Sequence, residues 1–98
     1  MVADLPEEYD PPHRLGWVLL QMGELERALG YAERAVALAY GPRKARVQGL
    51  LVSIHRARND GPAERAALEA VLATWRSLPE SQQNAGAIEQ AEEQLRGL

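Results

Sequence analysis

The side chains of this 98-residue sequence best suited to chemistry are two histidines, His13 and His55, and a basic run at positions 42–58. The histidines lie far apart in the chain and form no H-x3-H or H-E-x2-H pair, so we predict no metal site. Cysteine is absent, and no hydroxyl residue stands in a nucleophile motif. We therefore expect a protein that is not an enzyme and that has no catalytic residue, metal or cofactor.

Charge is concentrated in three segments of the chain. Residues 42–58 carry Arg43, Lys44, Arg46, Arg56 and Arg58 with no acid, whereas residues 1–12 and 80–98 are acidic and the whole chain has a net charge of −3. Nucleic-acid readers combine a basic domain with interleaved aromatic residues, and the basic run has none, so we expect no nucleic-acid partner. The favoured interpretation is a solvated face that pairs with the acidic ends; an acidic partner is the alternative.

Composition indicates a single helical domain. The chain is 46% hydrophobic, rich in Ala and Leu and poor in β-branched residues. No apolar run approaches the roughly 18 residues of a membrane span, and the acidic start is unlike a signal peptide, so we expect no membrane partner. The absence of Cys is compatible with a cytoplasmic location, which is our default. The preference for Arg over Lys is typical of a GC-rich bacterial genome.

Helix start and stop signals divide the chain into five helices. The signals are Asp10-Pro11-Pro12, Gly23, Gly41-Pro42, Asp60-Gly61-Pro62, Pro79 with Ser81 as the cap of the last helix, and Gly97. Gly41 and Gly61 are expected to take the left-handed conformation. The predicted organisation is an N-terminal arm at 1–9, which contains Val2, Leu5 and Tyr9, and one domain at 10–98. That domain comprises a hairpin at 10–41, a hairpin at 42–78 and a capping helix at 80–97.

Apolar residues at helical spacing predict which face of each helix is buried. The predicted stripes are Leu15, Val18, Leu19 and Met22; Leu25, Ala28, Leu29, Ala32, Ala35, Val36 and Ala39; Val47, Leu50, Leu51, Ile54 and Ala57; Ala66, Ala67, Ala70, Val71, Ala73, Thr74 and Trp75; and Ile88, Ala91, Leu95 and Leu98. Trp17 and Leu20 lie off the first stripe. They either anchor a ligand or pack within the molecule.

An internal repeat connects the two hairpins. Gly23-Glu-Leu-Glu-Arg-Ala-Leu29 matches Gly61-Pro-Ala-Glu-Arg-Ala-Ala67 at Gly, Glu, Arg and Ala, and Ala28, Ala32 and Ala35 recur as Ala66, Ala70 and Ala73. With Leu15-Gly16, these residues resemble the tetratricopeptide repeat, a helix–turn–helix unit of about 34 residues. The resemblance covers residues 10–98. The second repeat is divergent, with Ser53-Ile54 in place of Leu-Gly. The fold class that it implies is all-α, a right-handed superhelix of two antiparallel helical hairpins plus a capping helix.

The resemblance also implies a function, binding of a peptide or partner helix in a concave groove. Carried across by position, the groove residues are His13, Trp17, Leu20, Gln21, Lys44, Gln48, Leu51, His55 and Arg58. Trp17, Leu20 and Leu51 would supply apolar contact, and Lys44, His55 and Arg58 would select an acidic or C-terminal group. The basic clamp of chaperone-binding members is absent, because His13 and Trp17 stand at its first two places.

A different class of function stays open. The segments Leu38–Arg43 and Leu78–Gln82 are similar to helical appendages found behind thioredoxin-like domains in some bacterial proteins. This resemblance implies a structural or dimerisation piece of a longer protein with no ligand of its own. Self-association into a homodimer through the last helix is a further alternative to its role as a cap.

Overall fold

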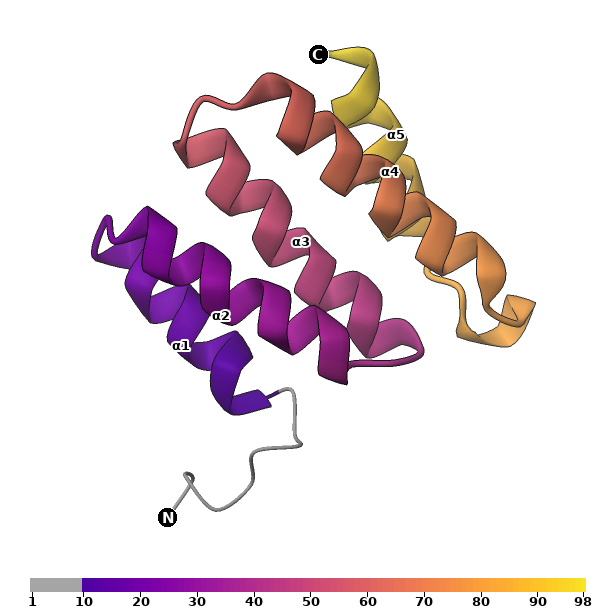
Figure 1. The fold of residues 1–98 in the computed structure, drawn as a ribbon. Helices are drawn as coiled ribbons and strands as arrows, with labels where there is room; N and C mark the ends of the chain where they lie inside the picture. Colours follow the sequence, from indigo (N-terminus) through magenta and orange to yellow (C-terminus); the bar gives the residue numbers. More distant parts are fainter. Residues whose placement is uncertain (1–9) are drawn as a thin grey trace.

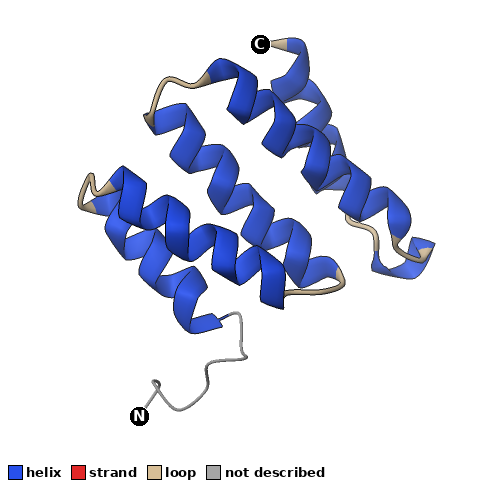
Figure 2. Ribbon diagram, viewed as in Figure 1, coloured by secondary structure: helices blue, strands red, loops and turns tan. Residues whose placement is uncertain are grey.

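The computed structural model describes residues 10–98, with side chains from residue 13 onward, and these residues form five α-helices joined by short loops (Figure 2). The helices are α1 (Asp10–Gln21), α2 (Leu25–Leu38), α3 (Pro42–Ala57), α4 (Gly61–Ser77) and α5 (Ala85–Arg96), with a short 3-10 helix, η2 (Glu80–Gln82), before α5. No strand occurs in residues 10–98, which confirms the prediction of an all-α protein. The predicted N-terminal arm at 1–9 lies outside the described residues.

Consecutive helices run in opposite directions, so that α1, α3 and α5 point one way and α2 and α4 the other (Figure 1). The most extensive packing is between α3 and α4 and between α1 and α2. Helix α3 is central because it also packs against α2, and α5 packs against α4. The largest fully buried side chains, Leu50, Ile54 and Val47, all belong to α3. The core is therefore organised around this helix.

The turns use left-handed residues, but at different positions from some of those predicted. Gly23 and Gly41 have φ of +79° and +64°, a conformation that glycine adopts without steric cost. Helix α2 ends earlier than expected, and Gly41 stands at the N-cap of α3 rather than ending α2. Asn59 (φ +57°), not Gly61, takes the left-handed position after α3. Asp60 then caps α4 through a hydrogen bond from the Ala63 N–H.

The last helix starts later than predicted, and its cap is not Ser81. Residues 80–82 form the 3-10 turn. The Gln83 side chain, just after this turn, donates to the carbonyl of Leu78, just before it, at 2.9 Å. Asn84 has extended backbone geometry and accepts a hydrogen bond from the Ala87 N–H at 3.0 Å, so it caps α5. Both Ser and Asn are good N-cap residues, and the turn after Pro79 decides which one precedes the helix.

The prediction of which face of α1 is buried is largely wrong. Of its four residues only Leu19 is buried, whereas Leu15, Val18 and Met22 are 45%, 53% and 66% exposed. Gly16 lies on the inner face instead, where a Cβ atom would come within 2.8 Å of the Leu50 Cδ2 atom. Helix α1 stands at one end of the stack, and among residues 10–98 it packs mainly against α2 and to a smaller extent against α3. The close approach allowed at Gly16 determines which face is covered.

The buried face of α4 also differs from the repeat-based prediction. Ala66 and Ala73 are exposed, although their counterparts Ala28 and Ala35 are fully buried. The predicted residues Ala67, Val71 and Trp75 are buried, and the large residues Leu68 and Leu72, which were not predicted, are buried with them. Burying Leu or Trp removes far more apolar surface from water than burying Ala, and this gain selects the face. Ala57 and Leu98, also predicted in apolar stripes, are exposed.

Candidate functional site

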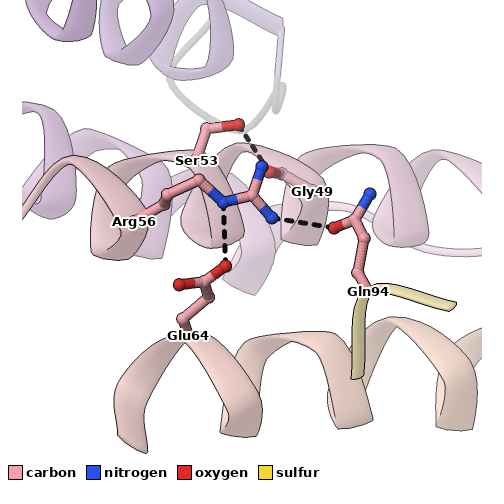
Figure 3. Close-up of polar contacts among 5 residues, drawn as sticks. All are labelled: Gly49, Ser53, Arg56, Glu64 and Gln94. Carbon is pink, nitrogen blue, oxygen red and sulfur yellow. Dashed lines mark hydrogen bonds and ion pairs between the residues drawn. The ribbon is translucent and has the colours of Figure 1, made fainter. Parts of the chain in front are cut away.

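A polar network joins the last three helices, and Arg56 is at its centre (Figure 3). The Arg56 Nε–H donates to Glu64 Oε2 at 2.8 Å, and its Nη2 group donates to Gln94 Oε1 at 2.9 Å. Glu64 is only 7% exposed, so its charge is balanced by the arginine within the protein. Because Arg56 is on α3, Glu64 on α4 and Gln94 on α5, one side chain fixes the relative position of three helices.

Beside this network lies an open cavity of about 350 Å³ between α3, α4 and α5. Each helix contributes residues three or four apart, which share a helix face. The lining residues are Ala45, Arg46, Gly49, Val52, Ser53 and Arg56 of α3; Leu68, Val71 and Trp75 of α4; and Asn84, Ala87, Gln90, Ala91 and Gln94 of α5 and its cap. The buried members form an apolar floor, and arginine and amide side chains form the rim. We call this cavity the α3–α5 groove.

Two features leave the α3–α5 groove open. Gly49 and Ser53 are both small residues on this face of α3, and a Cβ atom added at Gly49 would meet no other atom within 4 Å. The Ser53 hydroxyl donates to the Gly49 carbonyl at 3.3 Å, so it is turned back onto its own helix. None of the residues lining the groove is acidic. The groove is therefore apolar at its base and cationic at its edge.

The sequence-predicted groove residues of α1 are placed as follows. The Trp17 Nε1–H donates to His13 Nε2 at 3.0 Å, one helical turn away, and Trp17 remains exposed. Gln21 is exposed. Leu20 is half-buried and packs beside the cluster that contains Leu50, together with the predicted residue Leu51 of α3. Leu20 and Leu51 thus belong to the packing between α1, α2 and α3.

The remaining predicted residues lie on α3 or, for Arg58, at its C-cap, and they differ in burial and in their partners. Gln48 is 7% exposed and accepts a hydrogen bond from the Thr74 hydroxyl at 2.6 Å, so it is a buried contact to α4 and its predicted place in an open groove is wrong. Arg58 forms an ion pair with Glu26 of α2 at 3.2 Å, and its guanidinium is 3.4 Å from His55 Nδ1. Lys44 is half-buried.

None of the nine predicted groove residues lines the α3–α5 groove. Two residues along an α-helix rotate a side chain by roughly 200°, so the face of Arg46 is nearly opposite that of Lys44. Of the basic residues found in the sequence at 42–58, Arg46 and Arg56 line the groove. The sequence signal that could have found it is the pair of small residues, Gly49 and Ser53, on the same face as these arginines.

No three metal-ligating side chains lie together in the described part of the chain. Within residues 10–98, no helix combines the length and the apolar character needed to cross a membrane. The chain matches no protein-family model, no curated protein and no solved structure. The resemblance to tetratricopeptide repeats therefore rests on the sequence motifs alone and remains a prediction.

Proposed function

We propose that this chain is a protein-interaction module of the tetratricopeptide kind, and that it binds a peptide or partner helix in the α3–α5 groove. The observation that carries the proposal is the groove itself, an opening of about 350 Å³ with an apolar floor of Val52, Leu68, Val71 and Trp75. Openings of this size accept a few large side chains. When an apolar side chain displaces poorly ordered water from such an opening, affinity is gained.

The rim supports binding of a polypeptide. Asn84, Gln90 and Gln94 present carboxamides along α5, and such groups can donate to and accept from a peptide backbone. The Arg56 network fixes α5 relative to α3, so the groove is organised before a partner arrives. A prearranged site loses less conformational freedom on binding, which favours affinity. We propose no catalytic role and no cofactor.

A paired substitution tests the proposed groove. In Gly49→Leu, a large side chain on an open helix face fills the cavity, and we expect it to abolish binding while the helix gains intrinsic stability. Gly30→Leu is the matched control, because Gly30 is exposed on α2 with no atom near its Cβ position. Binding partners captured from lysate of the source organism should be retained by the parent and by Gly30→Leu and lost by Gly49→Leu. Partners retained equally by all three proteins would exclude the α3–α5 groove.

The second candidate function is that of a structural or dimerisation appendage of a larger bacterial protein. It is favoured by one specific observation, the exposed apolar residues Leu15, Val18 and Met22 of α1. Soluble monomers rarely leave contiguous apolar surface uncovered unless it has a partner. Molar mass measured over a hundredfold dilution tests this candidate. A dimer that persists on dilution and dissociates in Val18→Lys would favour it over peptide binding.

A further inference from the structure

The charges around the α3–α5 groove indicate what kind of segment it binds. Of its two arginines, Arg56 is already held by Glu64 and Gln94. Arg46 is exposed, and within residues 13–98 its guanidinium has no hydrogen bond or ion pair. No acidic side chain lines the groove. Arg46 is therefore an uncompensated positive charge at the edge of an apolar cavity, in a chain whose net charge is −3.

Asn84 adds a hydrogen-bond donor to the lining of the groove. Helices α3 and α5 run in the same general direction (Figure 1), and the Arg56 side chain of α3 donates to Gln94 of α5 (Figure 3). Arg46 lies ten residues before Arg56, and Asn84, the N-cap of α5, lies ten residues before Gln94; both Arg46 and Asn84 line the groove. The Asn84 side-chain oxygen caps α5, whereas its N–H₂ group can act as a donor. The lining of the groove thus offers a positive charge at Arg46 and a hydrogen-bond donor at Asn84.

The spacing between Arg46 and Arg56 indicates the length of the segment that the groove can bind. Ten residues of α-helix rise by about 15 Å, so Arg46 and Arg56 mark the two ends of the groove at about that separation. An extended chain advances about 3.3 Å per residue and would cover this distance with four or five residues. The apolar floor lies between the two ends, and the unpaired positive charge of Arg46 stands at one of them.

We infer that the α3–α5 groove binds an acidic peptide segment of another protein, in which a bulky apolar side chain enters the cavity and a nearby carboxylate is bound by Arg46. This inference rests on the proposed function. Arginine binds carboxylates through two parallel hydrogen bonds, and a charged hydrogen bond contributes roughly twice as much as a neutral one. Arg46 is then the residue that determines specificity, and Val52, Leu68, Val71 and Trp75 contribute apolar contact.

The test uses a displayed library of random eight-residue peptides, selected separately on four proteins. These are the parent, Arg46→Gln, Gly49→Leu and the control Arg34→Gln, which removes the same charge from an exposed position of α2. We expect the parent and Arg34→Gln to enrich peptides with Asp or Glu close to a large apolar residue. Arg46→Gln should enrich apolar peptides without the acid, and Gly49→Leu should enrich none.

The possible failures are distinguishable. If no peptide is enriched on the parent above Gly49→Leu, the proposed function itself is wrong. If apolar peptides are enriched but acids are not, or if Arg46→Gln keeps the preference for acids, the groove binds peptides and the role of Arg46 is wrong.

A calorimetric titration then measures the contact directly. One selected peptide and its Asp→Asn or Glu→Gln counterpart are titrated into the parent and Arg46→Gln. We expect about a tenfold or greater loss of affinity when either partner of the contact is changed, and little further loss when both are changed. Independent, additive losses would overturn the contact.

Discussion

The hairpin formed by α1 and α2 packs largely through small residues, whereas α4 packs against α3 and α5 mainly through large ones. Ala28, Ala32 and Ala35 of α2 are fully buried, and Gly16 lets α1 approach closely. At the corresponding place in the second hairpin stand Leu68, Val71, Leu72 and Trp75. Small residues bring helix backbones together and leave no space between them. Large residues form the interior side of α4, and a groove lined by some of them remains beside the small residues Gly49 and Ser53 of α3.

This comparison shows how one repeated signal produces two kinds of packing. The Gly, Glu, Arg and Ala of the repeat lie at or just before the start of both α2 and α4, and they indicate a helix start in each case. They do not specify which face is buried, because the neighbouring positions differ in size. The repeated alanines Ala28, Ala32 and Ala35 are buried in the first hairpin, whereas their counterparts Ala66 and Ala73 are exposed in the second. We therefore expect substitutions in the two regions to change the free energy of unfolding by different amounts and, for glycine, in opposite directions.

The largest effect is expected at Leu50, which is fully buried where α3 meets α1 and α2. Leu50→Ala should lower the free energy of unfolding by about 2–5 kcal/mol, since it removes buried methyl groups and leaves a cavity between closely packed helices. Urea denaturation followed by circular dichroism measures this change. Leu98→Ala, at an exposed position, should alter stability by less than about 0.5 kcal/mol. Similar values for the two variants would show that the first hairpin is loosely packed.

The sharpest test compares Gly16→Ala with Gly49→Ala. Alanine is favoured over glycine in a helix by about 0.5–1 kcal/mol, so Gly49→Ala, which meets no atom, should be stabilising by that amount. In Gly16→Ala the new methyl group meets the enclosed Leu50 side chain, and overpacking should reverse the sign to a loss of about 1 kcal/mol. The midpoints of urea denaturation report both changes. Changes of the same sign would contradict the proposed difference in packing.

A smaller and local effect is expected at the cap of α5. Asn84→Ala removes the hydrogen bond to the Ala87 N–H and should cost about 1 kcal/mol. Amide hydrogen exchange should increase mainly in α5, which covers one side of the groove. Ser81→Ala is the matched control, since Ser81 lies in the 3-10 turn and not at the cap. Faster exchange in Ser81→Ala than in Asn84→Ala would instead support the cap predicted from sequence.

The smallest effect is expected on the outer face of α1. Met22→Lys places a charge at a side chain that is already mostly in water, so the free energy of unfolding should change by less than about 0.5 kcal/mol. Leu19→Lys, on the buried face of the same helix, should strongly destabilise or unfold the protein. Thermal denaturation of both variants checks the assignment of faces. Strong destabilisation by Met22→Lys would mean that another surface covers this side of α1.

Much of the secondary structure could be predicted because its causes are local. Gly23, Pro42 and Pro79 stop or start helices through their own backbone restrictions, and Asp60 precedes α4 in both the prediction and the structure. The start of α5 could not be predicted in the same way. Ser81 and Asn84 are both suitable caps, and the turn between them is fixed by the hydrogen bond from Gln83 to the Leu78 carbonyl.

The candidate site could be predicted from the sequence to a much smaller extent. The charge analysis found the basic run of α3, but the groove residues carried over by the repeat resemblance do not line the α3–α5 groove. Gln48 could have faced solvent or α4, and its hydrogen bond with Thr74 decides for α4. A helical periodicity defines which residues share a face, but not which neighbour covers that face.

The sequence by itself thus determined the all-α class, the approximate ends of the helices and the positive charge of α3, because these depend on each residue and its near neighbours. Only the tertiary structure decided which side of α1 and α4 is buried, which arginine is paired and where the groove opens. These properties depend on side-chain volumes contributed by two or three helices at once. Gly16 against Leu50, and Gly49 in the lining of the α3–α5 groove, show that the same residue type closes one interface and leaves the other open.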